Sequence, residues 1–360
     1  MPKDVQTAAD GRVFTPEMQA DIKTTQTYMF NRILMLAAPV VMSWYYYGGR
    51  ALRVLAVAAL FAMVCEYIGM RLVGAVPALR DLSAAVTGVT TAMLLPASSP
   101  IWVVLLAVSF AVLAVKVPFG TARTLLFSPA AAGVAFVTVS LPEYVFTYPV
   151  LPAGGASVAV YGGEGFSAGV SLTQMLKTGT SMGSSLASYL EVLIGNVTGP
   201  MGAGCGIALL GALLFLAMRA RKGFTAAVSC LLTAALYALL FPRITTGRLQ
   251  SVFMELAGGM LLFTALFLLP EEAILPKHFW GRVAYGAAAG LLTMLFRRFG
   301  AYEEGAVFAV LLCNALTSAF DKLPEARFEI RAKRLARRKK REAQELSASP
   351  LTEQGGVQDA

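Results

Sequence analysis

Residues 52–70 read LRVLAVAALFAMVCEYIGM, and this stretch decides the class of fold. Only Arg53 and Glu66 are charged, and a helix of this length, at about 1.5 Å per residue, crosses the roughly 30 Å hydrocarbon core of a bilayer. Similar apolar runs recur along the chain, which has 57% hydrophobic and 14% charged residues and a mean hydropathy of +0.65. The sequence therefore predicts an all-α, polytopic membrane protein and excludes a soluble one.

The apolar runs predict about ten membrane-spanning helices, some of which could be broken or re-entrant. Their expected ranges are 30–48, 52–70, 82–97, 101–117, 126–141, 186–218, 224–241, 251–269, 281–296 and 305–320. The sixth is the least regular because it is interrupted by Gly195, Gly199, Pro200, Gly202 and Gly204. Its first half is expected to be re-entrant or interfacial, with 201–218 as the crossing proper, since freed backbone groups need protein or water around them.

Charge distribution predicts the orientation and three regions of the chain. Most of the 30 lysines and arginines fall on the side that carries both termini, so both termini are expected in the cytoplasm. The regions are a cytoplasmic segment at 1–29, a membrane domain at 30–321 and a cytoplasmic tail at 322–360. A glycine-rich loop at about 142–185 is then expected to face outward.

The basic stretch at 331–341, RAKRLARRKKR, could bind nucleic acid or anionic lipid. Its place directly after the last apolar run favours a retention signal at the cytoplasmic face of the lipid bilayer. We therefore expect no nucleic-acid partner. No protein-bound metal is expected either, because the four cysteines lie in separate apolar runs and His278 is the only histidine.

Two helix starts carry small and hydroxyl-bearing residues. One is built from Asp81, Ser83 and Thr87, and the other from Gly120 and Ser128. Free N–H groups at such starts suit ions or anionic and carbonyl-rich ligands such as a flavin. The alternative is that the small residues only let the helices pack closely.

Acidic residues inside apolar runs give a second pointer. Glu66 and Glu255 lie where a charge is costly, so each should face a cavity, pair with a base or be protonated, and either could belong to an ion path. Lys116 and Asp321 lie near the ends of runs, where their side chains can extend toward the interface, so they count for less.

Four stretches of the chain carry a resemblance: DLSAAVTGVTTAMLLP at 81–96, KVPFGTARTLLFSPAAAG at 116–133, IGNVTGPMGAGCGIALLGALLFLAMR at 194–219 and GRVAYGAAAGLLTMLFRRFGAYEEGAVFAVLLCNALTSAFD at 281–321. They resemble the NqrB/RnfD family of integral, flavin-carrying subunits of ion-pumping respiratory complexes. The resemblance implies a subunit of an Rnf- or Nqr-type translocase in the bacterial cytoplasmic membrane. It also implies partner subunits that carry flavin or iron-sulfur centres, coupled movement of Na⁺ or H⁺, and two similar helical halves.

In that family an outward S-G-A-T-P-L motif carries FMN as a phosphoester on its threonine, attached by a flavin transferase. Aligned from Ser167 through Gly169, this chain has Val170 at the attachment position, where no phosphoester can form. A shift of one residue makes Ser171 the acceptor, and Thr173 is a third possibility. The remaining alternative is a subunit that has lost covalent FMN and holds riboflavin or FMN without a covalent bond.

Two other functional classes stay open at the level of sequence. The same scaffold could be a transporter or channel for a small solute, including flavin itself. It could also be a structural subunit that only supports an assembly. Whether the chain is part of an enzyme is left undecided by its residues alone.

Overall fold

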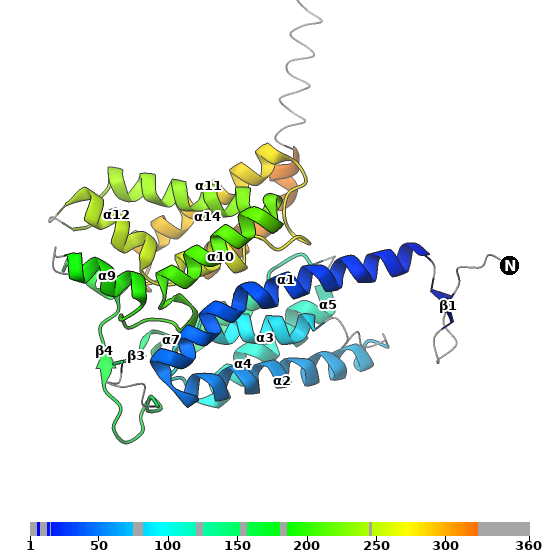
Figure 1. Ribbon diagram of the computed structural model, residues 1–360, viewed down its shortest axis with the longest axis horizontal. Coiled ribbons are helices and arrows are strands. Elements are labelled where there is room, and N and C mark those ends of the chain that lie inside the picture. Colours follow the sequence, from blue (N-terminus) through cyan, green and yellow to red (C-terminus); the bar gives the residue numbers. More distant parts are fainter. Residues whose placement is uncertain are drawn as a thin grey trace, which may run out of the picture.

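The computed structural model describes residues 6–7, 13–14, 16–74, 82–119, 125–151, 157–180, 186–244 and 247–322, with side chains from residue 26 onward. Helices dominate, and they form two groups that lie one above the other (Figure 1). Two short antiparallel pairings complete the described structure. In one, β1 (Gln6–Thr7) pairs with β2 (Val13–Phe14); in the other, β3 (Tyr148–Pro149) pairs with β4 (Ala168–Gly169).

The first group holds the N-terminal helices, drawn in blue and cyan in Figure 1. They are α1 (Pro16–Tyr47), α2 (Gly49–Leu72), α3 (Ser83–Met93), α4 (Ile101–Ser109), η2 (Phe110–Lys116), α5 (Val117–Phe119), α6 (Pro129–Ser140) and α7 (Pro142–Phe146). The segment 101–119 is continuously helical, with a wider π-helical stretch in η2. Proline stands in the first turn of α6, where its missing N–H costs no hydrogen bond.

The second group holds the C-terminal helices together with α8, which directly precedes them in the sequence. They are α8 (Leu172–Thr178), α9 (Leu186–Ile194), η4 (Met201–Ala203), α10 (Gly206–Arg219), α11 (Arg221–Leu240), α12 (Arg248–Ala257), α13 (Leu261–Phe267), α14 (Phe279–Phe299) and α15 (Ala306–Ala315). The two groups meet where α1 packs against α10 and α6 against α15. One continuous cluster of buried apolar side chains runs through both.

Glycines set how closely neighbouring helices approach. Gly88 of α3 faces the backbone of α2 at Ala58, and Gly133 of α6 faces that of α4 at Ala107. Gly286 and Gly290 of α14 do the same against α11. A Cβ at any of these positions would collide with a facing carbonyl oxygen, so glycine is what permits the close contact.

Only part of the expected set of spans is confirmed. Among the described residues, four helices are long and apolar enough to cross a membrane: α2, the segment Ile101–Phe119, α11 and α14. A fifth is added if α12 and α13 count as one bent span. Helices α6, α10 and α15 are apolar but shorter, so a total of ten spans is not confirmed.

The span expected over 251–269 is a bent pair of helices. Helices α12 and α13 meet at an angle of 53°. The break falls at Gly258 and Gly259, and Gly259 has the left-handed φ of 64° that favours glycine. The irregularity expected at 186–218 is present, because α9 ends at Ile194 and α10 begins only at Gly206, with the short η4 between them.

Candidate functional site

The first helical group buries one ion pair, formed by Lys116 of η2 and Glu66 of α2. The lysine Nζ lies 2.7 Å from Glu66 Oε1 and donates a hydrogen bond of 2.6 Å to Ser83 Oγ of α3. Lys116 is 4% exposed, so its side chain is directed into the protein and does not extend toward the membrane interface. We name these three residues the Lys116 cluster. One base faces one acid, and the pair is balanced in charge.

A small cavity beside this cluster brings three predicted site residues together. Ser83, Thr87 and Ser128 all line it, although they come from α3 and from the residue before α6. Its volume is only about 20 Å³, close to the room that one water molecule occupies. The cavity as it stands is therefore too small for a flavin ring. The predicted residues Asp81 and Gly120 lie outside the described residues.

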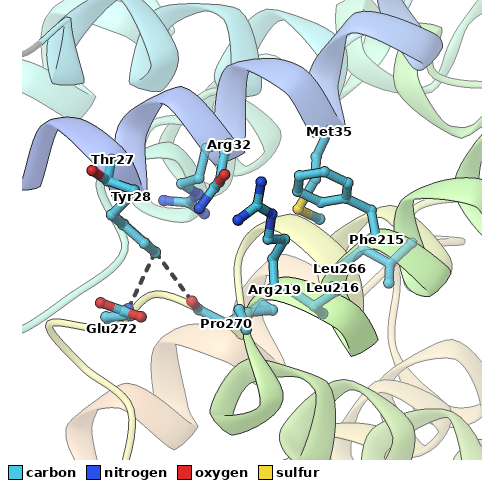
Figure 2. A pocket seen from close by; sticks show the side chains of 12 residues that line it. Thr27, Tyr28, Arg32, Met35, Phe215, Leu216, Arg219, Leu266, Pro270 and Glu272 are labelled. Atoms are coloured by element: carbon cyan, nitrogen blue, oxygen red, sulfur yellow. Dashed lines mark hydrogen bonds between the residues drawn. The ribbon is translucent and has the colours of Figure 1, made fainter. Parts of the chain in front are cut away.

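A second cavity of about 360 Å³ lies between α1, α10 and the segment after α13 (Figure 2). Its apolar walls are Met35, Phe215, Leu216 and Leu266, and its polar lining includes Thr27, Tyr28, Asn31, Arg32, Arg219 and Glu272. Volumes of several hundred Å³ with apolar walls and a few polar groups are typical of small-molecule sites. We call this the α1–α10 cavity.

Hydrogen bonds fix one wall of the α1–α10 cavity. The Tyr28 hydroxyl donates to the carbonyl of Pro270 at 3.1 Å and accepts from the backbone N–H of Glu272 at 3.2 Å (Figure 2). Arg32 donates to the carbonyl of Phe267 and pairs with Glu271 at 3.3 Å. These contacts hold α1 against the end of α13.

Arg219 lines this cavity with a positive charge that has no partner among the described residues. It ends α10, is solvent-exposed, and has no hydrogen bond or ion pair with any residue that the structure describes. Figure 2 shows its guanidinium between Arg32 and Met35. The cavity thus combines an aromatic and aliphatic wall with an unpaired positive charge, an arrangement that fits a planar ring carrying an anionic group.

The second helical group buries a larger set of charges around Arg297 of α14. Arg297 bonds Glu255 of α12 at 3.1 Å and Glu304 at 2.9 Å, and Arg243 bonds the other oxygen of Glu255 at 2.5 Å. Arg297 also donates to the carbonyls of Glu255 and Gly258, at 2.6 and 2.8 Å. We name Arg243, Glu255, Arg297, Glu303 and Glu304 the Arg297 cluster.

The two predicted flavin acceptors lie against this cluster. Ser171 donates to Glu303 Oε2 at 3.0 Å, lies 3.1 Å from the Thr173 hydroxyl, and caps α8 by accepting from the backbone N–H of Gln174 at 3.1 Å. Ser171 is 2% exposed and Thr173 is 1% exposed. Both hydroxyls are therefore buried in this structure, and covalent attachment of FMN at either one stays a prediction.

The rest of the predicted attachment motif lies nearer the surface. Val170 is 52% exposed but has no hydroxyl, and Ser167 is exposed. Gly169 pairs with Tyr148 across the two short strands and lies against Thr198, whose methyl group a Cβ would meet at 2.5 Å. The motif is therefore held as part of a packed loop.

The carboxyl group of Glu303 has a pKa that is raised well above its ordinary value. Burial raises the pKa of its carboxyl to about 7, and the neighbouring Glu304 adds to the rise. The hydrogen bonds from the hydroxyls of Ser171 and Tyr148 and the charge of Lys177 oppose it. Burial and the nearby Glu303 raise the pKa of Tyr148 above its ordinary range.

Sequence reasoning identified only some of these groups. Glu66 and Glu255 are paired with bases, one of the three arrangements expected for them, whereas their place in an ion path stays a prediction. Arg297, Glu303, Glu304 and the α1–α10 cavity were missed. The signal was the run of charges RRFGAYEE at 297–304, placed directly between two apolar runs.

Comparison with known proteins adds a family. Residues 15–328 match the family described as NQR2, RnfD, RnfE. The chain is 27% identical over 306 residues to the D-type subunit of the Na(+)-translocating ferredoxin:NAD(+) oxidoreductase complex of Acetobacterium woodii, over 84% of this chain and 90% of that protein. It is 30% identical over 320 residues to the D-type subunit of the ion-translocating oxidoreductase complex of Klebsiella pneumoniae, over 80% and 90% of the two chains.

Proposed function

Because the chain belongs to the NQR2, RnfD, RnfE family, we propose that it is the D-type membrane subunit of an Rnf-type ion-translocating oxidoreductase complex. The observation that carries the proposal is the match over residues 15–328, which takes in both helical groups and both charge clusters. The partners are then the other subunits of that complex and the surrounding lipid. The setting is the bacterial cytoplasmic membrane, with both termini in the cytoplasm and the 142–185 loop outside.

The shorter helices would complete the crossing in this setting. Helices α3, α6, α10 and α15 are each too short to span alone, and α1 is long. With α1, and with the shorter helices crossing together with their extended flanks, the chain would reach about ten spans. Such broken helices are tolerated where they line a protein interior or a polar cavity.

The α1–α10 cavity is the place that we propose for a flavin held without a covalent bond. Phe215 and Leu216 would pack against the ring, and Arg219 would meet the phosphate of FMN. A bound flavin supplies one- and two-electron transfer, while the protein sets its distance, its hydrogen bonding and its electrostatic surroundings. This chain's own contribution is to hold α1, α10 and the α13 end around the cavity, through Tyr28 and Arg32.

The buried acids would serve the ion-coupling part of the function. Glu66 and Glu255 are both buried and both paired with bases that belong to other helices. A shift of those helices would change the pairing and with it the affinity of each carboxylate for a cation. The choice between Na⁺ and H⁺ depends on which of the two these carboxylates then bind.

The experiment measures flavin on the complex purified with its native partners and flavin transferase. After acid precipitation, flavin released to the supernatant is non-covalent, and fluorescence that stays with the denatured band of this chain is covalent. We expect released flavin in the wild type, a loss of at least half of it in Arg219→Gln, and no loss in the control Arg221→Gln, which is exposed and does not line the cavity.

A second part of the experiment tests covalent attachment of FMN. A fluorescent band in the wild type that disappears in Ser171→Ala, or in Thr173→Ala, would place FMN on that hydroxyl and would show that the loop opens before attachment. A complex with neither released nor covalent flavin, yet intact, would contradict the electron-transfer proposal for this chain. It would favour a scaffolding subunit or, if the purified chain carries solute flux in liposomes, a transporter.

A further inference from the structure

The small cavity beside the Lys116 cluster lies between the two helical groups. Its walls come from α1, α3, η2 and the start of α6 in the first group, and from the end of α13 and the segment after it in the second. Lys116, Arg32 and Glu271 all line it. Since Lys116 is paired with Glu66 and Arg32 with Glu271, two separate ion pairs contribute to the wall of this one cavity.

Ser128 gives the cavity a hydroxyl that is not used elsewhere. It occupies the N-cap position of α6, where a serine normally accepts a hydrogen bond from a backbone N–H of the first turn. Its side chain makes no such bond, and no hydrogen bond joins its hydroxyl to another described residue. The residue is 2% exposed. A buried serine that lines a cavity and does not cap its helix indicates a ligand in that cavity.

Glu271 contributes a second open group, from the other helical group. One carboxylate oxygen, Oε1, accepts from Arg32 at 3.3 Å. The other, Oε2, is buried and has no hydrogen-bond partner in the described part of the chain. The residue is 9% exposed and lines the same cavity as Ser128. One ligand that bonds both groups would satisfy the two together.

Size and charge identify that ligand as water. The cavity has a volume of about 20 Å³, which is room for one water molecule and too little for an organic ring. The two ion pairs that border it are each balanced, so no further ion is needed to neutralise them. A water molecule can donate to Glu271 Oε2 and accept from the Ser128 hydroxyl, which uses both open groups.

Lys116 supplies a third partner for this water. A lysine ammonium group has three N–H donors. In the described structure Nζ lies 2.7 Å from Glu66 Oε1 and donates to Ser83 Oγ at 2.6 Å, which accounts for two of them. Because Lys116 also lines the cavity, its third N–H can donate to the water. Buried waters typically make about three hydrogen bonds, and Ser128, Lys116 and Glu271 provide that number.

We propose that the small cavity binds one water molecule between Ser128, Lys116 and Glu271, and that a proton passes through this water between Lys116 and Glu271. The water site follows from the described residues alone. The proton transfer rests on the proposed function, because it gives an ion-translocating subunit a route for protons from one helical group to the other.

The transfer conserves atoms and charge. One N–H bond of Lys116 breaks as its proton moves to the water oxygen, while the water passes one of its own protons to Glu271 Oε2. The water is thereby regenerated. Lys116 regains a proton from the carboxyl of Glu66, whose Oε2 is buried without a partner among the described residues and is available to carry one. No electron moves in these steps.

Arg32 joins this route to the α1–α10 cavity, because it lines both cavities (Figure 2). Its positive charge beside Glu271 favours the carboxylate, so a proton taken up there is released again while the pair is intact. A ligand in the α1–α10 cavity that draws Arg32 away would make Glu271 hold the proton. The charged and titratable groups around Glu271 are Tyr28 and Arg32 of α1, Lys116 of η2, Tyr285 of α14 and Glu272 of its own segment.

The first test looks for the water in the complex purified with its native partners. In a density map that resolves ordered waters, we expect one peak at about 2.6–3.2 Å from both Glu271 Oε2 and Ser128 Oγ. Ser128→Val should expel it, because the side chain fills the cavity and lacks the hydroxyl. Thr138→Val is the matched control, since that buried hydroxyl of the same helix bonds the carbonyl of Val134 and does not line the cavity. A wild-type map with an empty cavity, or with Ser128 bonded directly to Glu271, overturns the proposal.

The second test follows protons with the same complex in liposomes, where proton movement and electron transfer are measured together. We expect Glu271→Gln and Ser128→Val each to lower the number of protons moved per electron by at least about tenfold. Glu164→Gln, an exposed acid away from the cavity, should leave the ratio unchanged. Circular dichroism and co-purification with the partners show that each variant is folded. A wild-type complex that moves no protons, or an unchanged ratio in both cavity variants, overturns the transfer step.

Failure of this proposal and failure of the proposed function are separable. If the complex transfers electrons and moves ions while its cavity is empty, only the water site and its proton route are wrong. If the water is present in the map but the complex transfers no electrons, the water site stands and the proposed function falls.

Discussion

In the first helical group a single lysine meets a single carboxylate, whereas in the second group two arginines meet three carboxylates. The Lys116 cluster is balanced, and the Arg297 cluster has one more carboxyl group than it has guanidinium groups. The additional group is Glu303, which is bonded by the hydroxyls of Ser171 and Tyr148 and has no ion pair among the described residues. Buried charge therefore joins helices in both groups, and only the second group also buries a carboxyl without a basic partner in the described part of the chain.

The largest expected effect comes from Arg297→Met, which leaves Glu255 and Glu304 buried without their main partner. Breaking a buried ion pair from one side costs about 3–5 kcal/mol, and here two acids are affected, so we expect a loss of at least about 5 kcal/mol in the free energy of unfolding. Reversible unfolding in mixed detergent micelles measures it. Arg298→Met is the matched control, because that neighbour is exposed and, among the described residues, bonds the carbonyl of Phe241 and lies over its ring without an ion pair. Equal losses in the two variants would show that Arg297 is not the centre of the cluster.

Lys116→Met should have the next largest effect, about 3 kcal/mol, because it leaves only Glu66 unpaired. The double variant Lys116→Met with Glu66→Gln should recover most of that loss, since no uncompensated charge then remains buried. The same unfolding measurement applies to both. A double variant that is as unstable as the single one would contradict a balanced, purely structural pair.

Glu303→Gln tests the comparison through the pH dependence of the free energy of unfolding, measured in choline buffers without sodium. The pKa of Glu303 is raised to about 7 in the folded chain, against about 4.3 for an ordinary glutamate, so the folded state holds the proton more tightly. Stability contributed by this group should be present below about pH 4.3 and should fall as the pH rises toward 7. The variant should lack this slope and should be more stable than the wild type at pH 8, by roughly 1–3 kcal/mol. Parallel pH profiles would refute the assignment.

The smallest effect is expected from Ser171→Ala, at about 1 kcal/mol, because a hydrogen bond to Glu303 and the cap of α8 are lost together. Ser167→Ala is the control on the exposed part of the same loop. The two variants should differ in thermal unfolding of the full chain, and equal midpoints would mean that the Ser171 contacts do not support the loop.

The apolar runs located helices better than they counted spans. The run at 52–70 lies inside α2, and that at 101–117 lies inside the continuous helix Ile101–Phe119. The run at 251–269 conceals a bend, because average hydropathy does not register the left-handed φ of Gly259. At Gly259 a Cβ would also collide with the Glu304 carboxylate, a contact that only the folded chain reveals.

The site was foreseen where residues lie close in sequence and missed where they meet in space. Ser83, Thr87 and Ser128 were singled out at two helix starts, and the structure gathers them around one small cavity. Arg243 and Arg297 were not singled out in the sequence, yet both are bonded to Glu255. No local pattern states that an arginine at the end of one helix will meet an acid of another.

The guanidinium of Arg297 holds more than carboxylates. Two of its hydrogen bonds go to the carbonyls of Glu255 and Gly258, at the end of α12 where the bent pair breaks. Free carbonyls and the negative end of the helix dipole are thereby satisfied by the same group that neutralises the acids. The bend between α12 and α13 and the ion pairs of Arg297 are mechanically coupled, because α12 cannot move against α14 without separating Arg297 from Glu255. Any movement of α12 therefore also changes the local electric field.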